Sequence, residues 1–230
     1  MENLTLFNGN CLDFLKTLED ETIDLVVTDP PYRVISGGKN DGKDKRPSGI
    51  LTKNDGKIFN HNDIQIVDYL PELYRVLKPN TDAYIMTNNI NLRDLLNIAH
   101  DVGFKLHNLL VWEKNNVTPN RWYMKNLEYT VYLYKGNARP INNPSSKQSF
   151  NFPNPRNKVH PTEKPVELME HYILNSSDPG AVVLDPFLGG GATGVAAIRN
   201  DRKFVGCELE ENYFNIAKER IEGELTPIFI

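Results

Sequence analysis

The chain has 230 residues, of which 40% are hydrophobic, and a formal net charge of −4. This length and apolar content suit one domain over residues 1–230 with a buried core and leave no room for a second full domain. The two distant cysteines and the scattered histidines exclude a disulfide framework and predict no metal site, and the lack of a long apolar run predicts a soluble, cytoplasmic protein without a membrane partner.

The first third of the chain predicts a strand, a helix, a second strand and a long loop. Apolar runs at Leu4–Phe7 and Ile23–Val27 flank a helically spaced segment at Leu12–Leu18. The second run is almost entirely apolar, which predicts a strand buried on both faces. Residues 36–60 are rich in Gly, Lys, Asp and Asn without an apolar period, so we expect a mobile loop there.

The middle third predicts two helices and three strands. The expected elements are a helix at 64–77, a strand at 83–86, a helix at 92–101 and an antiparallel pair of strands at 106–112 and 129–134. We expect Pro71 to bend or restart the first of these helices and residues 78–80 (KPN) to end it. Residues 136–159 are rich in Asn, Pro and Ser and have no clear period, so we expect irregular structure.

The last third returns to regular alternation. It predicts a helix at 165–174, a strand at 181–184, a glycine turn, a helix at 192–199, a strand at 204–206 and a closing helix. Strands that alternate with helices favour an α/β fold with a mostly parallel, doubly wound sheet covered on both faces.

The charge is distributed unevenly along these elements. Residues 33–57 carry a net +4 and residues 114–164 a net +7, which leaves −15 on the other 154 residues. A polyanion can dock on the two basic stretches while the acidic remainder limits indiscriminate binding. Charge alone fits two solvated loops equally well.

One chemical motif, Asp29-Pro30-Pro31-Tyr32, directly follows a buried strand. The carboxyl ends of parallel strands form the ligand crevice of such sheets. The prolines remove two N–H donors, so the Asp29 carboxylate and the Pro30 carbonyl form a rigid set of acceptors that suits an amino group, and Tyr32 can stack on a base. The alternative is a simple turn that closes the strand.

A second motif at residues 183–194 (VLDPFLGGGATG) joins a buried strand to a helix through a glycine turn. Gly189, Gly191 and Gly194 satisfy the GxGxxG pattern, and Glu208 ends the next strand, where an acid can hold ribose hydroxyls. This motif alone fits a nicotinamide dehydrogenase as well. It excludes a phosphate-binding P-loop, because no Lys followed by Ser or Thr comes after the turn.

Together the two motifs favour a different function, because a dehydrogenase has no use for a set of acceptors that binds an amino group. We call this set, at residues 29–32, the amino clamp. An early Asp-Pro-Pro-Tyr and a late Asp-Pro-Phe with a glycine turn resemble the amino-methyltransferases of DNA (N6-adenine or N4-cytosine) in their beta-class motif order. The segments 73–79 (LYRVLKP), 112–114 (WEK) and 160–165 (HPTEKP) are similar to that family too, so the resemblance covers nearly the whole chain. It implies a Rossmann-like fold that binds S-adenosyl-L-methionine (SAM).

The resemblance also implies site residues. Asp29, Pro30, Pro31 and Tyr32 are the implied catalytic residues. The implied cofactor-binding residues are Asn10, Cys11, Asp29, Thr162, Lys164, Asp185, Pro186, Phe187, Gly189, Gly191, Thr193 and Glu208. Thr162 and Lys164 are placed near the cofactor carboxylate, and Glu208 near its ribose. Asn10 stands where the family often has Asp, and Ala192 where it commonly has Thr, so weaker cofactor binding is expected.

The implied activity is direct methyl transfer to the N6 of adenine in a base flipped out of duplex DNA. Asp at the head of the clamp favours adenine within the family. The alternatives left open are N4-cytosine methylation, RNA adenine methylation and a non-catalytic cofactor- or DNA-binding module. A homodimer is common in the family, and a cognate restriction endonuclease is a further candidate partner.

DNA recognition is expected from the inserted segment 115–159. Its basic and aromatic residues can contact phosphates and base edges or stack on bases. The candidates are Arg121, Lys125, Arg139, Lys147 and Arg156, with Trp122, Tyr123, Phe150 and Phe152. Tyr132 and Tyr134 fit sheet packing equally well.

Overall fold

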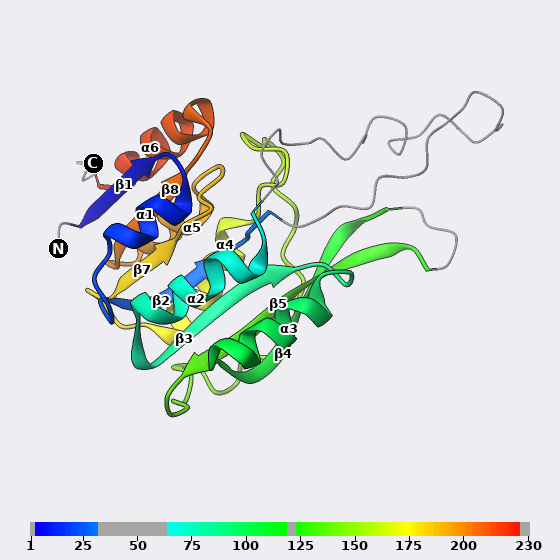
Figure 1. Cartoon of the computed structure of the whole chain (residues 1–230). Coiled ribbons are helices and arrows are strands. Elements are labelled where there is room, and N and C mark those ends of the chain that lie inside the picture. Colours follow the sequence, from blue (N-terminus) through cyan, green and yellow to red (C-terminus); the bar gives the residue numbers. More distant parts are fainter. Residues whose placement is uncertain (1–2, 32–63, 119–122, 226–230) are drawn as a thin grey trace, which may run out of the picture.

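The computed structural model describes residues 3–31, 64–118 and 123–225. The expected loop at 36–60 and the residues Tyr32, Arg121 and Trp122 lie outside this part. The described chain builds one eight-stranded sheet with the strand order β1-β8-β7-β2-β3-β5-β4-β6 (Figure 1). The α/β fold predicted from the sequence is therefore confirmed.

The elements follow one another along the chain as the alternating pattern predicts. They are β1 (Leu4–Asn8), α1 (Cys11–Thr17), β2 (Ile23–Thr28), α2 (Ile66–Val76), β3 (Leu77–Thr87), α3 (Leu92–Val102), β4 (Lys105–Thr118), β5 (Lys125–Lys135), β6 (Ser149–Phe150), α4 (Val166–Ser176), β7 (Val182–Asp185), α5 (Ala192–Arg199), β8 (Lys203–Glu208) and α6 (Glu211–Leu225).

The sheet is mostly parallel. Strand β5 pairs antiparallel with both β3 and β4, while the other paired strands run parallel. The chain leaves β7 toward β8 on one side and leaves β2 toward β3 on the other, so the strand order reverses between β7 and β2. Such a reversal opens a crevice at the carboxyl ends of the two strands.

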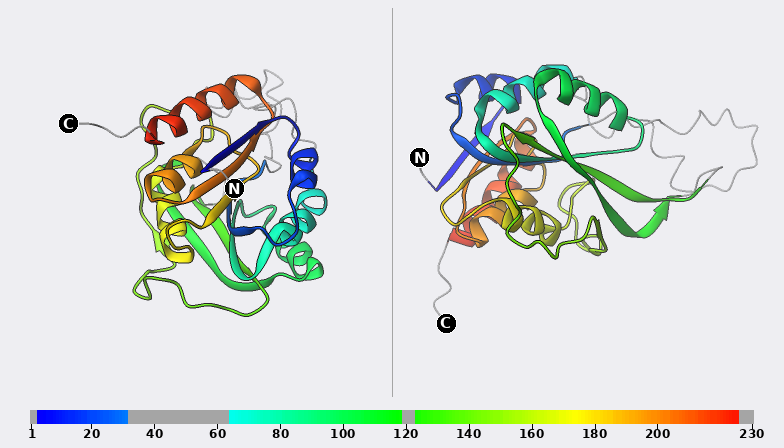
Figure 2. Two further views of the ribbon diagram at one scale, coloured as in Figure 1. Left: turned by 90° about the vertical axis from the view of Figure 1, so that its left-hand side faces the viewer. Right: turned by 90° about the horizontal axis from the view of Figure 1, so that it is seen from below.

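Helices cover both faces of the sheet. Helices α1, α2 and α3 pack on one face and α4, α5 and α6 on the other, and Figure 2 shows the two layers edge-on. Strand β2 faces both layers, because Leu25 and Val27 belong to the core under α4–α6 and Val26 to the core under α1–α3. This double burial explains why its sequence is almost entirely apolar.

The structure corrects the boundaries of two predicted elements. Strand β3 begins at Leu77, where the helix predicted to end at residue 77 has already stopped, and Leu77 pairs with Ile23. The predicted stop signal at 78–80 thus lies within the strand, with Asn80 in a left-handed conformation (φ 63°). Pro71 does not divide α2, which runs as one helix from Ile66 to Val76.

The inserted segment also differs from the prediction. Strands β4 and β5 form a longer hairpin than expected, and residues 149–150 within the irregular stretch add a short strand beside Val111 and Trp112. As a result Phe150 is buried in the core, and the prediction that it contacts DNA is wrong. Tyr132 is buried between the rings of Tyr84 and His107, which identifies it as sheet packing.

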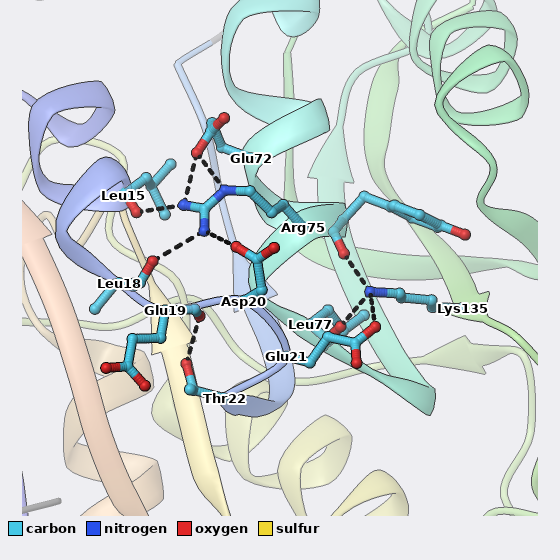
Figure 3. A network of polar contacts seen from close by, with 11 residues as sticks. Leu15, Leu18, Glu19, Asp20, Glu21, Thr22, Glu72, Arg75, Leu77 and Lys135 are labelled. Carbon is cyan, nitrogen blue, oxygen red and sulfur yellow. Dashed lines mark hydrogen bonds and ion pairs between the residues drawn. The ribbon is translucent and has the colours of Figure 1, made fainter.

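A polar network lies at the amino ends of the central strands β2 and β3, opposite the carboxyl ends that form the crevice (Figure 3). The Arg75 guanidinium of α2 donates hydrogen bonds to the carbonyl oxygens of Leu15 (2.8 Å) and Leu18 (2.9 Å) at the end of α1. Lys135 of β5 donates to the Leu77 carbonyl (2.7 Å) and pairs with Glu21 (3.1 Å). The last carbonyl groups of a helix lack hydrogen-bond donors within the helix. This network supplies donors to the carbonyl groups at the end of α1 and links that helix to β2 and β3.

Within the described residues, every helix is too short or too polar to cross a membrane.

Candidate active site

The predicted crevice lies where β2 and β7 end side by side. Asp29 follows β2 and Asp185 ends β7, and the two strands pair through Leu25–Val183 and Val26–Leu184. The hydroxyl of Thr28 donates a hydrogen bond to Asp185 Oδ1 (2.7 Å), which also accepts one from the backbone N–H of Phe187 (3.1 Å). The two acidic residues singled out from the sequence are thus brought to one place.

Asp29 keeps one free acceptor in this crevice. Its Oδ2 accepts a hydrogen bond from the ammonium of Lys164, which also lies 3.4 Å from Glu128 Oε2. Its Oδ1 is buried and has no hydrogen-bond partner among the described residues. A buried acceptor without a donor is costly, so this atom is available to accept an N–H from a ligand.

Burial changes the protonation of both carboxyl groups. Burial raises the pKa of Asp29. The positive charge of Lys164 opposes this increase in the pKa, and the negative charge of Glu128 adds to it. Burial also raises the pKa of Asp185 to about 6, against hydrogen bonds from Thr28 and Thr193 that favour the ionised form. Ionisable groups shifted in this way gather at functional sites.

The glycine turn between β7 and α5 is held by β8 and α6. The N–H of Gly189 donates to Glu208 Oε2 (2.8 Å), and the N–H of Leu188 donates to the Cys207 carbonyl (2.9 Å). Gly191 caps α5 in a left-handed conformation (φ 83°), and a Cβ added there would lie 3.0 Å from Ala217 of α6. The turn therefore needs glycine both for its backbone conformation and for its close approach to α6.

The segment 160–165 lies against this turn. Glu163 accepts hydrogen bonds from the Val159 N–H (2.8 Å) and from Arg220 of α6 (2.9 Å), and Arg220 also donates to the Gly190 carbonyl. The His160 ring packs edge-on against Tyr213, and burial lowers its pKa to about 4, so it is neutral near pH 7. These contacts place Lys164 at the crevice.

The end of β1 borders the same site. The N–H of Gly9 donates to the Glu208 carbonyl (2.9 Å), and Asn10 caps α1 by accepting the Leu12 N–H (2.8 Å). Burial raises the pKa of the Cys11 thiol to about 11 and that of Cys207 as well. Neither cysteine is thus available as a thiolate nucleophile near neutral pH.

Most sequence-predicted site residues lie around this one crevice. Those on the ends of β1, β2, β7 and β8 and on the glycine turn are Asn10, Cys11, Asp29, Pro30, Pro31, Asp185, Pro186, Phe187, Gly189, Gly191, Thr193 and Glu208. Lys164 reaches it through Asp29, whereas Thr162 is exposed and its hydroxyl lies 3.2 Å from His160 Nδ1. The placement of Tyr32 is outside the described residues.

Sequence reasoning missed several residues of the site. Glu128 and Lys114 join the Asp29–Lys164 pair, Arg220 holds the glycine turn, and Tyr69 of α2 packs edge-on against Phe187 (5.1 Å between ring centres). The signal for Glu128 was its position as the one acid in the apolar, aromatic strand β5, because acidic residues are seldom buried without a partner.

A hollow of about 200 Å³ opens beside the clamp on the face covered by α2 and α3. Pro30 and Pro31 form part of its wall, together with Met86 and Thr87 at the end of β3 and Asn91 at the start of α3. Pro30 and Pro31 are thus accessible from this side.

The hairpin of β4 and β5 reaches beyond the helices that cover the sheet (Figure 1) and exposes large side chains near its tip. Tyr123 is 90% exposed and Met124 64%, and Val117 on β4 is 53% exposed. Lys125, which begins β5, is exposed beside them. Large apolar side chains exposed together on a basic hairpin are typical of an interaction surface.

Comparison with known proteins identifies similar chains. The sequence model of the DNA methylase family N6_N4_Mtase matches residues 23–219. The Type II methyltransferase M2.DpnII of Streptococcus pneumoniae is 30% identical over 96% of this chain and 90% of its own length, and M2.MboI of Moraxella bovis is 29% identical over 99% and 90%.

Solved structures share the fold. The M1.HpyAVI–SAM complex superposes with a TM-score of 0.71 at 23% identity and covers 94% of this chain and 99% of its own. The cytosine-N4-specific PvuII DNA methyltransferase gives a TM-score of 0.74 at 19% identity over 100% of this chain and 89% of its own.

Proposed function

The chain belongs to the N6/N4 family of SAM-dependent DNA methyltransferases, and on this premise we propose that it methylates the N6 amino group of adenine in duplex DNA. The observation that carries the proposal is the buried, unpaired Oδ1 of Asp29 at the reversal of the strand order. An acceptor in that position suits an exocyclic amino group, which has two N–H donors. The nicotinamide dehydrogenase suggested by the glycine turn alone is set aside.

The residues of the crevice fit the cofactor. SAM carries a sulfonium and an ammonium, and its ribose has two hydroxyl donors, so it needs acidic partners. Asp29, Asp185 and Glu208 supply three carboxylates at the ends of the adjacent strands β2, β7 and β8. We expect Glu208 to bind the ribose, Asn10 and Cys11 to lie by the adenine end, and Thr162 and Lys164 to lie by the carboxylate end.

The turn residues complete the proposed cofactor site. Pro186, Phe187, Gly189, Gly191 and Thr193 follow Asp185 in the chain and surround the start of α5. Bound SAM supplies an electrophilic methyl group. Because the N–H of Gly189 and the hydroxyl of Thr28 already hold the Glu208 and Asp185 carboxylates, the protein orients both acids before the ligand arrives.

Asp29 is the proposed acceptor for the target amino group. Its Oδ1 would accept one N–H and the Pro30 carbonyl a second, which would draw the nitrogen toward tetrahedral geometry and free its lone pair for in-line attack on the methyl carbon, as the bond from that carbon to the sulfonium sulfur breaks. The nitrogen then loses one proton, for which Asp29 is an acceptor within reach. Tyr32 is proposed to stack on the base. The amino nitrogen is itself the nucleophile, so neither a covalent enzyme intermediate nor a thiolate is needed.

Recognition of DNA is proposed to rest on the segment 115–159. The tip of the hairpin exposes Tyr123 and Met124, and the cations Lys125, Arg139, Lys147 and Arg156 are exposed along the segment. Phosphates attract such cations, and an exposed aromatic ring can take the place of a flipped base in the stack. A homodimer and a cognate restriction endonuclease remain predictions about its partners.

The test is transfer of labelled methyl from SAM to unmethylated duplex DNA, followed by mass spectrometry of the released nucleosides. We expect N6-methyladenine. N4-methylcytosine would contradict the choice of base, which the shared fold of the PvuII enzyme does not decide. Competition with RNA tests the alternative polymer, and transfer to RNA alone, or to neither polymer with SAM bound, would contradict the proposed substrate.

A further inference from the structure

Four charged side chains from four separate segments form an alternating chain that ends at the proposed clamp. Lys114 of β4 donates a hydrogen bond to Glu128 Oε1 of β5 (2.9 Å). Glu128 Oε2 lies 3.4 Å from the ammonium of Lys164, and that ammonium bonds Asp29 Oδ2. The four formal charges cancel, and each cation lies between or beside carboxylates.

This chain is buried to an unusual degree for charged groups. Only 6% of the Lys164 side chain is exposed, with 18% of Glu128 and 20% of Lys114. Desolvated ion pairs seldom stabilise a fold more than apolar residues of the same size would, so their presence calls for another reason. Their position provides one, because the chain ends on the carboxylate that is proposed to hold the substrate.

The arrangement around Lys164 explains how Asp29 keeps a free oxygen. An ammonium that faced Asp29 alone could share its protons between both carboxylate oxygens and compete with a substrate N–H. Here the same ammonium also lies 3.4 Å from Glu128 Oε2 and donates to the Thr162 carbonyl (3.2 Å), and Lys114 holds Glu128 in place through its other oxygen. Asp29 Oδ1 and Glu128 Oε2 are both left without a hydrogen bond among the described residues.

We propose that Glu128, held by Lys114, is a positioning residue that divides the Lys164 ammonium between two carboxylates and so sets the acceptor strength of Asp29. The inference rests on the proposed function, since it concerns the same clamp. Glu128 does not touch the substrate in this role and acts through Lys164.

Two substitutions should move the protonation of Asp29 in opposite directions. Glu128→Gln removes a negative charge and leaves Asp29 as the one carboxylate among the described residues that pairs with Lys164, which lowers the pKa of Asp29. Lys114→Met removes a positive charge and frees Glu128 to draw Lys164 away, which raises it. Asp185 of β7 and the Tyr69 hydroxyl of α2 also face Asp29, and neither variant changes them.

The experiment measures both activity and protonation in the full-length protein with SAM. We expect the acidic limb of the pH profile for kcat to move to lower pH in Glu128→Gln and to higher pH in Lys114→Met, each with roughly a tenfold loss of kcat at its optimum. A titration of the Asp29 carboxyl carbon by NMR, assigned with Asp29→Asn, should shift with the same two signs.

Glu113→Gln is the matched control, because Glu113 lies on β4 next to Lys114, is exposed and contacts Asn126 rather than the chain of charges. It should leave the profile and the titration unchanged. Equal shifts in both variants, or none, would overturn the inference even if the wild type methylates DNA. If the wild type proves inactive on DNA, the proposed function fails, while the NMR titration still decides whether Glu128 and Lys114 control Asp29.

Discussion

The ends of β2, β7 and β8 and the tip of the β4–β5 hairpin differ in how strongly their neighbours constrain them. In the first region, Asp185 is 3% exposed and the glycine turn is held by hydrogen bonds with β8 and α6. In the second, Tyr123 is 90% exposed and Met124 64%. The first region is thus packed like a protein core, whereas the second exposes side chains that a partner could bury.

The difference separates the two tasks that we assign to the enzyme. Methyl transfer requires the amino nitrogen and the methyl carbon to be held within about 0.5 Å of the productive geometry, which rigid packing provides. Reading DNA requires contact with a large polyanion, which an extended, basic hairpin provides. Changes in the first region should alter catalysis or folding, and changes at the tip of the hairpin should alter DNA binding alone.

The largest effect is expected at Asp29. Asp29→Asn replaces an acceptor oxygen with a donor and removes the charge that Lys164 pairs with, so kcat should fall by about 10²–10⁴-fold. Single-turnover methylation of duplex DNA measures the loss. Binding of SAM, measured by calorimetry, should persist through the carboxylates of Asp185 and Glu208, which would place the defect in transfer rather than in cofactor binding.

Asp101→Asn is the control for this prediction, because Asp101 is exposed on α3 and has no contact with the crevice. It should keep wild-type turnover. A near-normal rate in Asp29→Asn would contradict the amino-clamp mechanism and would turn attention to another acceptor in the crevice.

The packing of the glycine turn is the next point to test. A Cβ at Gly194 would lie 2.3 Å from Ile221 and 2.8 Å from Phe204, both fully buried. Gly194→Ala should therefore lower the free energy of unfolding by about 1–3 kcal/mol, even though alanine favours the helix. Urea unfolding with and without SAM measures this change.

Gly223→Ala offers the same substitution in α6, where nothing lies within 4 Å of the added atom. It should stabilise the protein by about 0.4–1 kcal/mol through the unfolded chain and the helix preference. If both variants behaved alike, the close packing of α5 against α6 would not be the reason for glycine at position 194.

Much of the constrained region could be predicted from the sequence, because local signals and topology agree there. An apolar run followed by Asp at residues 23–29 and again at 182–185 predicts two buried strands with acids at their carboxyl ends. Contacts across the fold had no such signal. Lys164 and Asp29 are 135 residues apart, and the sequence places Lys164 only through family resemblance.

Two failures show how tertiary contacts override local signals. The Lys-Pro-Asn turn signal at 78–80 did not delay β3, because Leu77 already pairs with Ile23 and Asn80 tolerates a left-handed conformation. A two-residue strand such as β6 shows no periodicity, so the burial of Phe150 beside Trp112 could not be foreseen.

The buried charge of Asp185 predicts a stability that depends on pH. Its folded-state pKa of about 6 lies above the ordinary value of 3.8, so the native state holds the proton more tightly. The stability that this provides is complete below pH 3.8 and is lost as the pH rises through about 6. At neutral pH, Asp185→Asn should therefore be more stable than the wild type by about 1–3 kcal/mol.

Urea unfolding of both proteins across this pH range checks the sign. The two should have similar stability at the acidic end and diverge toward neutral pH. A constant difference would mean that lost or gained hydrogen bonds, rather than the charge, explain the variant. Divergence would show that the crevice keeps an ionised group at a cost in stability, as expected where function requires it.

The smallest effect is expected on the hairpin, where a single lysine provides only one of many contacts to DNA. Lys125→Met should weaken binding to duplex DNA a few-fold and lower the slope of log K against log salt by about 1, the effect of one lost phosphate contact. SAM affinity and the free energy of unfolding should not change, because Lys125 is exposed and has no part in the core. Fluorescence anisotropy of labelled duplex across a salt series measures both quantities.

Lys218→Met is the matched control, since Lys218 is exposed on α6 and its ammonium lies 3.8 Å from Glu222 within the same helix. An equal change in salt slope for the two variants would mean that DNA senses only the overall charge, and the distinction between a catalytic crevice and a separate reading hairpin would fail. A change confined to Lys125→Met would place the phosphate backbone at the hairpin, because the two variants lose the same charge and differ only in where they lose it.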